Sequence, residues 1–329
     1  MNSDGSAGVT SVTVKAPPLG AVLGLVGACF FWGIGFPITK AFALRAHLEA
    51  PCASDWFIVA ILVAGRFFLA GLILLALERT RPTRLELEQG IWVGLFSACG
   101  LLLQTDGMAR TDASISAFLT QGYVVVLPVV AAVAVRRWPE ARVVLAVLGI
   151  VLGLAVLARF DPRTFHLGRG EWETLVAALF FGLQILSLGR AKYRGNRSGP
   201  VSVVFFFVNA LGALPLALAT FSGEALGQLV TSRETLILFG LLVVLGTLCP
   251  FLLMNRNQPH VPPAEAGIIY GAEPLFGSGF ALLLPVLLTP LAGISYANEQ
   301  LTPRLLLGGA LVTLANVVLQ LRGPRQGAT

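Results

Sequence analysis

The chain alternates between long apolar runs and short polar segments. Ten apolar runs can be marked, at residues 19–44, 56–77, 89–109, 113–135, 141–158, 172–189, 201–221, 235–255, 264–288 and 304–321. A bilayer-spanning helix needs roughly 18 or more predominantly apolar residues, and the runs reach that length. The alternating strand-length segments of an outer-membrane barrel are absent from the pattern. The sequence therefore predicts an all-α integral membrane protein with ten transmembrane helices.

The composition agrees with this prediction. Of the residues, 56% are hydrophobic and 12% are charged, whereas soluble domains carry about 25% charged residues. The net charge of +6 comes from Arg-rich connecting segments, and membrane orientation explains these better than nucleic-acid binding does. The 3 His and 4 Cys residues form no ligand-spaced cluster. We therefore expect no metal site and no cofactor.

The distribution of Lys and Arg predicts the orientation in the membrane. With the N-terminus inside, the inner connecting segments hold twice as many Lys and Arg residues as the outer ones, as expected for cytoplasmic loops. Residues 1–18 lack the basic start and apolar core of a signal peptide. We expect a multi-pass protein of the cytoplasmic (inner) membrane, in which residues 1–18 and 322–329 are cytoplasmic tails.

The second half of the chain resembles the first. The segment "FFWGIGF" (Phe30–Phe36) matches "LFFGLQI" (Leu179–Ile185), and "ASISAFLTQGYVVVLP" (Ala113–Pro128) aligns with "AEAGIIYGAEPLFGSG" (Ala264–Gly279). Chance similarity between apolar segments is the alternative explanation. Five runs in each half place the second copy upside down, because five is odd. We expect two inverted five-helix repeats, residues 19–158 and 171–321, around a central cavity near the midplane.

Five segments together resemble the EamA-type transporters of the drug/metabolite transporter superfamily, over nearly the whole chain. They are "FFWGIGF", "GRFFLAG", "QTDGMARTDASISAFLTQGYVVVLP", "YGAEPLF" and "NEQLTPRLLLGGAL". The resemblance implies ten helices around a central cavity and the carriage of small metabolites or amphipathic compounds, often outward. Two positions depart from the family pattern. Arg136 stands near the place of an expected Glu, and extra residues before Glu299 place that Glu in a loop or helix cap.

Arg66 lies near the middle of the second apolar run, where an Arg costs about 2.5–3.5 kcal/mol on insertion scales. The chain tolerates this cost only if protein or cavity water shields the guanidinium from lipid. Asp106 and Glu273 are the candidate acidic partners. Arg66 alternatively binds the carboxylate of a substrate directly, or it donates to backbone carbonyls and has only a structural role.

Other intramembrane residues are candidates for the cavity wall. Pro274 follows Glu273 and frees the carbonyl of Tyr270, which then needs cover from protein or water. Pro37 predicts a similar kink in the first run. Aromatic rings suit stacking on a substrate or core packing, and amides suit substrate contact or interhelical hydrogen bonds. The residues concerned are Trp32, Tyr123, Tyr270, Gln104, Gln121, Gln184 and Asn209.

These features predict a secondary transporter of a small metabolite or amphipathic compound, with an amino-acid-like substrate favoured because Arg66 suits a carboxylate. The family resemblance implies export as the direction. Asp106 and Glu273 are candidates for coupling transport to protons or another ion. The expected partners are the lipid bilayer and a small-molecule substrate, with no nucleic acid and with the oligomeric state open. The alternative is an intramembrane lipid-processing enzyme, which would need a nucleophile–base pair or a metal cluster.

Overall fold

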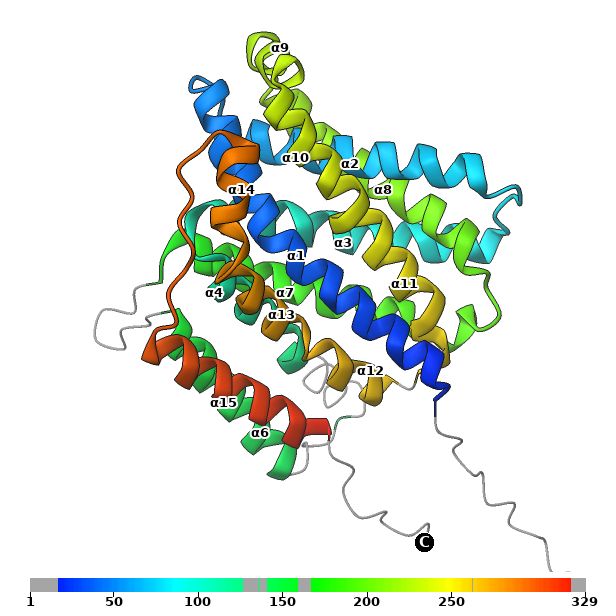
Figure 1. Ribbon diagram of the computed structural model, residues 1–329. Coiled ribbons are helices and arrows are strands. Elements are labelled where there is room, and N and C mark those ends of the chain that lie inside the picture. Colours follow the sequence, from blue (N-terminus) through cyan, green and yellow to red (C-terminus); the bar gives the residue numbers. More distant parts are fainter. Residues whose placement is uncertain (1–16, 127–135, 137–140, 159–166, 262, 321–329) are drawn as a thin grey trace, which may run out of the picture.

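The regular elements of the described chain are all helical (Figure 1). The computed structural model describes residues 17–126, 136, 141–158, 167–261 and 263–320. In chain order the main helices are α1 (Leu19–Glu49), α2 (Asp55–Leu77), α3 (Arg84–Arg110), α4 (Ala113–Thr120), α6 (Ala141–Leu157), α7 (Arg169–Leu188), α8 (Ser198–Ala219), α9 (Gly223–Thr231), α10 (Arg233–Val243), α11 (Cys249–Asn257), α12 (Pro263–Tyr270), α13 (Glu273–Ala281), α14 (Leu284–Ala292) and α15 (Pro303–Gln320). Short helical segments η1 (Ala191–Tyr193), η2 (Val244–Leu248) and η3 (Gln258–His260) complete the described set.

Several helices are long and apolar enough to cross a membrane. The described residues contain 6 such helices, or 7 if α13 and α14, which meet at a bend of 60°, form one span. Shorter apolar helices occupy Ala113–Val126, Ala141–Leu157 and Pro303–Val318. The chain is thus a multi-pass helical membrane protein. Each of the ten predicted runs contains helix, although residues 127–135 of the fourth run lie outside the described residues.

The ninth run was predicted as one span over residues 264–288 with a kink at Pro274, and the structure interrupts it twice. It is divided into α12, α13 and α14. Pro274 is the second residue of α13, and Pro285 is the second residue of α14. Because proline lacks a backbone N–H and clashes with the preceding turn, it is accommodated in the first turn of a helix but interrupts a longer one.

Polar residues between the runs begin several helices by capping them. The side chain of Ser54 accepts a hydrogen bond from the backbone N–H of Phe57 at 3.1 Å. Thr83 and Glu86 form a reciprocal capping box at the start of α3, which satisfies two otherwise unpaired groups. These caps fix where each span leaves its connecting segment.

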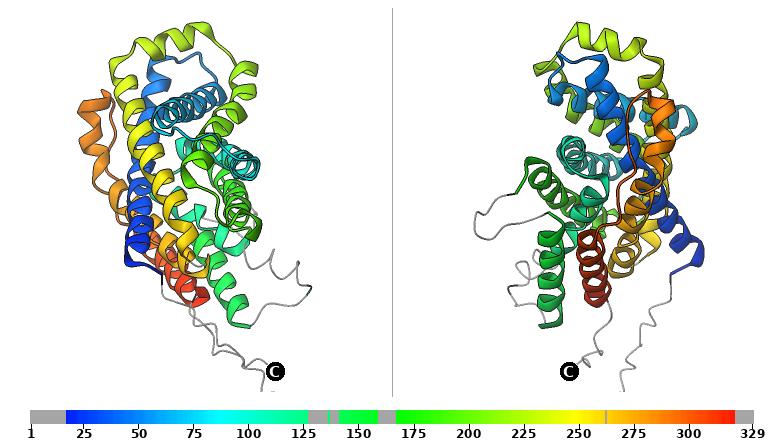
Figure 2. Two further views of the ribbon diagram at one scale, coloured as in Figure 1. Left: turned by 90° about the vertical axis from the view of Figure 1, so that its right-hand side faces the viewer. Right: turned by 60° about the vertical axis from the view of Figure 1, so that its left-hand side comes forward.

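The main helix contacts join the first half of the chain to the second. Helix α1 packs on α11 and α13, and its sequence counterpart α7 packs on α3 and α4. Helix α2 pairs with α8, and α6 pairs with α15. Figure 2 shows α1 and α10–α14 to one side and α2, α3, α7 and α8 to the other. The space between these two groups receives side chains from both halves of the chain.

Gly33 and Gly182, which align when the segments "FFWGIGF" and "LFFGLQI" are compared, both make close contacts with another helical segment. A Cβ on Gly33 of α1 would lie 2.6 Å from the Cβ of Phe276, and a Cβ on Gly182 of α7 would lie 3.0 Å from the Cβ of Val126. A distance of 2.6 Å is shorter than real Cβ contacts and one of 3.0 Å is shorter than most of them, so each glycine lets its helix lie directly against a partner. Both glycines therefore lie at close helix contacts.

Close packing of α6 on α15 depends on Gly153, which follows Gly149 at the small-residue spacing that lets helices approach closely. A Cβ there would lie 2.7 Å from Cγ2 of Val312 and 2.9 Å from the carbonyl oxygen of Gly308. We expect Gly153→Leu to lower the free energy of unfolding by about 1–3 kcal/mol through overpacking. Thermal unfolding in detergent measures this effect. Gly227→Leu is the control, because that exposed position has no atom within 4 Å of a Cβ, and equal melting temperatures would contradict the prediction.

Candidate functional site

A central cavity with an internal volume of about 100 Å³ lies between the two groups of helices. This volume is below the roughly 300–1,000 Å³ of sites for drug-sized ligands, so this conformation leaves room for a small solute. Side chains from both halves of the chain form its wall. They are Trp32, Gly35, Phe36, Thr39, Arg66, Leu101, Gln104, Met108, Thr120, Tyr123, Phe181, Gln184, Ile185, Gly246, Phe251, Met254, Tyr270 and Glu273.

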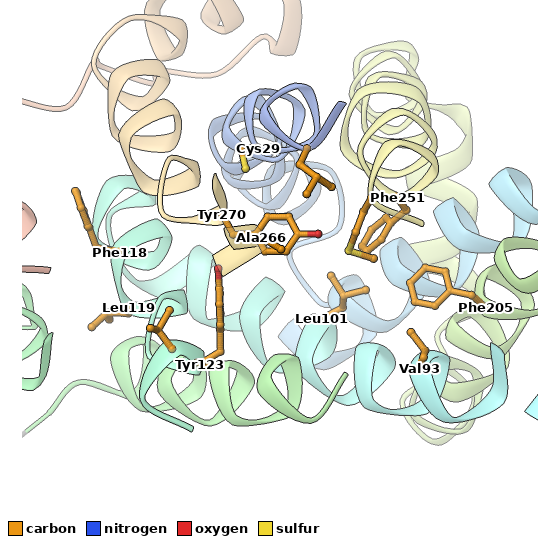
Figure 3. Close-up of a cluster of buried hydrophobic side chains, with 14 of the residues drawn as sticks. Cys29, Val93, Leu101, Phe118, Leu119, Tyr123, Phe205, Phe251, Ala266 and Tyr270 are labelled. Atoms are coloured by element: carbon orange, nitrogen blue, oxygen red, sulfur yellow. The ribbon is translucent and has the colours of Figure 1, made fainter. Parts of the chain in front are cut away.

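Most residues predicted from the sequence to form the site line this one cavity. Trp32, Arg66, Gln104, Tyr123, Gln184, Tyr270 and Glu273 all belong to its wall. Figure 3 shows Tyr123 and Tyr270 extending into the same interior space, with Phe251 and Leu101 beside them. The ring of Trp32 packs edge-on against Phe251, with ring centroids 5.6 Å apart. The wall therefore combines aromatic faces with a few polar groups, as small-molecule sites commonly do.

Arg66 reaches the cavity from α2 and is only 5% exposed. Its buried Nε has no hydrogen-bond partner, and among the described residues no carboxylate oxygen lies within 4.0 Å of its guanidinium. The predicted ion pair of Arg66 with Asp106 or Glu273 is therefore absent from this structure, and so is the alternative of donation to backbone carbonyls. The guanidinium lies over the ring of Phe67, 5.2 Å from its centroid, and its N–H groups have no acceptor among the described residues. They can therefore bind an anion that enters the cavity.

Glu273 lies at the break between α12 and α13, at the cavity wall. It is 8% exposed, and its carboxylate has no hydrogen-bond or ion-pair partner among the described residues. The carbonyl of Tyr270 accepts a hydrogen bond from Nε2 of Gln121 at 3.3 Å, which confirms that the backbone freed before Pro274 is covered by protein. Helix α4 also ends at this level, because Gln121 is its C-cap. Two interrupted helices from different halves therefore meet beside the cavity.

The predicted amides have different roles. Nε2 of Gln104 donates to Oγ1 of Thr120 at 2.8 Å, so this pair presents a joined polar surface to the cavity. Gln184 lines the cavity from α7. Asn209 does not, because its Nδ2 donates to the carbonyl of Phe205 at 2.8 Å within α8. Gln121 bridges α4 and α12, as interhelical bonding would require.

Asp106 was expected to face Arg66, and the structure places it elsewhere. Its Oδ2 accepts hydrogen bonds from Nε of Arg110 at 3.0 Å and from Nη2 of Arg169 at 2.6 Å. Arg110 also pairs with Asp55 of α2. The side chain of Asp106 is fully buried, and these two arginines offset the penalty of burying its charge. We call Asp55, Asp106, Arg110 and Arg169 the acid–arginine clasp; it joins α2, α3 and α7 at one end of the bundle.

The kink residues and the apolar wall complete the account of the predicted residues. Pro37 is buried inside α1, and its neighbours Phe36 and Thr39, rather than Pro37, line the cavity. The sequence analysis missed several wall residues, such as Met108, Phe181 and Met254. Their types are the ordinary types of a membrane-protein core, so the sequence carried no signal that could separate them from packing residues.

Glu299 caps α4, which confirms its assignment to a loop or cap. Its Oε1 accepts from the backbone N–H of Ala113 at 2.7 Å and its Oε2 from that of Ser114 at 3.3 Å. The N-cap residue Asp112 makes no side-chain cap. The carboxylate therefore satisfies the first N–H groups of α4 and interacts favourably with its dipole.

We expect Glu299→Ala to lower the free energy of unfolding by about 0.5–2 kcal/mol, the usual effect of losing a helix cap. Thermal unfolding of the detergent-solubilised protein measures the change. Gln300→Ala is the matched control, since Gln300 is the exposed next residue in the same segment. The assignment fails if both variants melt at the wild-type temperature.

Comparisons with known proteins were consistent with a membrane transporter. No family model matches the chain. A protein of Archaeoglobus fulgidus named "Uncharacterized transporter" is 25% identical over 304 residues, which are 92% of this chain and 86% of that protein. A solved crystal structure aligns with 87% of this chain and 95% of its own, with a TM-score of 0.52 and 16% identity, which shows a similar fold alone. The chain is thus a distant relative of a protein named as a transporter.

Proposed function

We propose that the protein is a secondary transporter that carries a small carboxylate-bearing solute through the central cavity. The observation that carries the proposal is Arg66, buried in the cavity wall against the ring of Phe67 and without a hydrogen-bond or ion-pair partner among the described residues. An unpaired cation in a membrane interior is expensive, and such residues commonly mark a substrate or ion pathway. The distant relative named as a transporter supports this class of function.

The transport mechanism in this proposal is alternating access by two inverted repeats, residues 19–158 and 171–321, which together form ten transmembrane helices. The contacts of α1 with α11 and α13 match those of α7 with α3 and α4, which supports the repeats. The close contacts of Gly33 and Gly182 also support them. Broken helices from both halves beside the cavity are a further supporting feature, since transporters bind substrate at such breaks. Rocking of one repeat against the other then exposes the cavity to each side in turn.

The substrate class that the cavity suits best is an amino acid or a close analogue. Arg66 provides a planar fork for a carboxylate, and Glu273 in the same wall provides a carboxylate for an ammonium group. The rings of Trp32, Tyr123 and Tyr270 can cover an apolar side chain. The resemblance to EamA-type transporters supports export as the direction.

Glu273 is also the residue we propose for coupling to protons. Its carboxylate is buried in the cavity wall and has no partner among the described residues, so its charge depends on what the cavity contains. A proton can replace the ammonium group of the solute when the solute leaves. Asp106 is not proposed for this role, because it lies outside the cavity wall and pairs with Arg110 and Arg169.

The protein belongs, in this proposal, to the cytoplasmic membrane, with both termini and the connecting segment at 189–197 in the cytoplasm. The Lys and Arg bias supports this orientation. Single cysteines introduced into a Cys-free variant and labelled with a membrane-impermeant reagent in whole cells test it. We expect no labelling at residues 5, 195 or 325 and labelling at residue 227. An accessible C-terminus together with an inaccessible N-terminus would contradict an even number of spans.

A thermal-shift screen of the detergent-solubilised protein against amino acids, their amides and their amines tests the substrate class. A ligand that binds only the folded protein increases the free energy of unfolding, by about 2.7 kcal/mol at a hundredfold excess over Kd. The melting temperature rises as a result. We expect shifts from solutes with a free carboxylate and none from the matching amides. Stabilisation by neutral lipids alone would favour a different function.

A further inference from the structure

A second hollow, with an internal volume of about 740 Å³, lies at the end of the bundle where α7, α8 and α11 meet. We call it the basic vestibule. Its wall consists of Gln89, Leu188, Gly189, Arg190, Tyr193, Arg194, Gly195, Asn196, Arg197, Ser198, Val201, Asn255, Arg256, Gln258, Pro259, His260 and Val261. None of these wall residues is an acid, whereas four are arginines.

Three of the vestibule arginines form no close ion pair with the described residues, although Arg190 interacts electrostatically with Glu88. Arg190, Arg194 and Arg256 are exposed, and none of them lies within 4.0 Å of a carboxylate oxygen of the described residues. Arg197 differs, because its Nη2 pairs with Oε2 of Glu86 at 2.8 Å. That hydrogen bond raises the pKa of Arg197, so the pair stays ionised and holds the segment before α8 in place. The three remaining arginines make the hollow positive, and a concave low-dielectric wall focuses such a field.

Hydrogen bonds fix the shape of the vestibule independently of any ligand. Nδ2 of Asn196 donates to Oε1 of Gln89 at 2.8 Å, and Lys192 pairs with Glu88 of α3 outside the hollow. The connecting segment between α7 and α8 is therefore tied to the start of α3. A pre-formed wall lowers the entropic cost of binding a ligand.

The basic vestibule and the central cavity follow one another along the same helices. On α7, Ile185 lines the cavity and Leu188 lines the vestibule. On α11, Met254 lines the cavity and Asn255 lines the vestibule. One helical turn covers about 5.4 Å, so only a thin partition separates the two spaces.

A single hydrogen bond forms part of that partition. The hydroxyl of Tyr270, a cavity residue, donates to Oε1 of Gln258, a vestibule residue, at 2.5 Å. Both side chains are buried. Breaking this bond and turning the Tyr270 ring would join the vestibule to the cavity that holds Arg66.

We propose that the basic vestibule is an entry site that binds the anionic group of the transported solute before it reaches Arg66, and that the Tyr270–Gln258 pair closes the passage between the two sites. The inference rests on the proposed transport function and adds a second site to it. The ligand is a small organic anion with a carboxylate, since the same group then suits Arg66. An anionic lipid headgroup has related charge, and the experiment below separates the two.

Thiol modification in detergent tests the site without a known substrate. A Cys-free variant receives one reporter, Ser198→Cys in the vestibule or Thr120→Cys in the cavity. Reaction rates with anionic, cationic and neutral methanethiosulfonates are compared at low salt. We expect the anionic reagent to react faster than the cationic one at Ser198→Cys, and roughly 1 M salt to abolish the difference.

Variants of the arginines test the entry site, and Tyr270→Phe tests closure of the passage. Arg194→Gln and Arg256→Gln should each lower the anionic-to-cationic rate ratio by about two- to fourfold, whereas Arg233→Gln, an exposed arginine of α10, should leave it unchanged. Tyr270→Phe should raise the rates at Thr120→Cys for all reagents and leave those at Ser198→Cys unchanged. Equal rate ratios in all arginine variants would contradict the entry site. An unchanged rate at Thr120→Cys in Tyr270→Phe would contradict closure of the passage by the Tyr270–Gln258 pair.

The lipid alternative has its own arm in the same assay. Sodium acetate and glutamate should slow the reaction of Ser198→Cys with the neutral reagent, more than equal concentrations of sodium chloride do. Protection by phosphatidylglycerol in the micelles, without protection by acetate or glutamate, would assign the vestibule to lipid and overturn the inference. None of these readouts requires transport, so their failure leaves the thermal-shift test of the proposed function intact.

Discussion

Arg66→Ala is expected to abolish solute binding while the protein stays as stable as the wild type. Truncating one partner of a buried, hydrogen-bonded charge pair costs about 2–5 kcal/mol, which is at least about 30-fold in affinity. Arg66 has no acidic partner among the described residues in the unliganded structure, so its removal leaves no buried acid unpaired. The removal also relieves the desolvation penalty of the guanidinium. The thermal shift produced by the best solute in the screen, together with the melting temperature without solute, measures both effects.

Two further variants define the Arg66 result. Arg66→Lys keeps the charge but loses the planar fork, and we expect weaker binding in a protein that still folds. Asn209→Ala is the matched control, because Asn209 is a buried polar residue that bonds within α8 and lies outside the cavity wall. Arg66→Ala with wild-type affinity would remove the cavity cation from the binding site, and an Arg66→Ala protein that does not fold would show that this residue is structural.

Glu273→Gln is expected to remove the pH dependence of transport while carboxylate-bearing solutes still bind. The carboxylate has no partner among the described residues that would hold its charge, and it shares the cavity with Arg66. Glutamine has nearly the same shape but cannot exchange a proton. Transport by the reconstituted protein at several pH values, with and without a pH gradient, measures the change.

Asp106→Asn separates coupling from structure in the same experiment. The clasp partners Arg110 and Arg169 donate to this carboxylate and keep Asp55 and Glu173 as partners without it. We therefore expect Asp106→Asn to lower the free energy of unfolding by about 1.5–3 kcal/mol, the usual effect of losing a hydrogen bond to a charged group, and to leave the pH dependence in place. Loss of pH dependence in Asp106→Asn alone would reverse the roles proposed for the two acids. Wild-type pH dependence in both variants would contradict coupling through either.

The sequence predicted the positions of the helices better than the pairing of their charges. Each apolar run contains helix because roughly 20-residue apolar segments have few alternatives in a bilayer. The pairing of Asp106 with Arg110 had a local signal, since residues four apart on a helix are neighbours. The contact of Asp106 with Arg169 joins distant parts of the chain, and no local pattern specifies it.

The cavity itself could be predicted in part. Ionisable and amide side chains inside the spans were informative because burying them in lipid is unfavourable, and Arg66, Gln104, Gln184 and Glu273 do line the cavity. The break at Glu273 was signalled by Pro274. The vestibule was not predicted, because a basic connecting segment is ordinary for an inner loop. Its hollow shape depends on how Asn196 is held against Gln89.

Transport by the purified protein in liposomes tests the central claim most directly. Vesicles containing wild-type protein, Arg66→Ala or Asn209→Ala are loaded with the radiolabelled amino acid that gives the largest thermal shift, and its release is followed with chemical analysis of the product. The account predicts release of the unchanged solute by the wild type and by Asn209→Ala at similar rates, and release at the protein-free rate by Arg66→Ala. Equal release by wild-type and Arg66→Ala vesicles, or a chemically altered product, would contradict it.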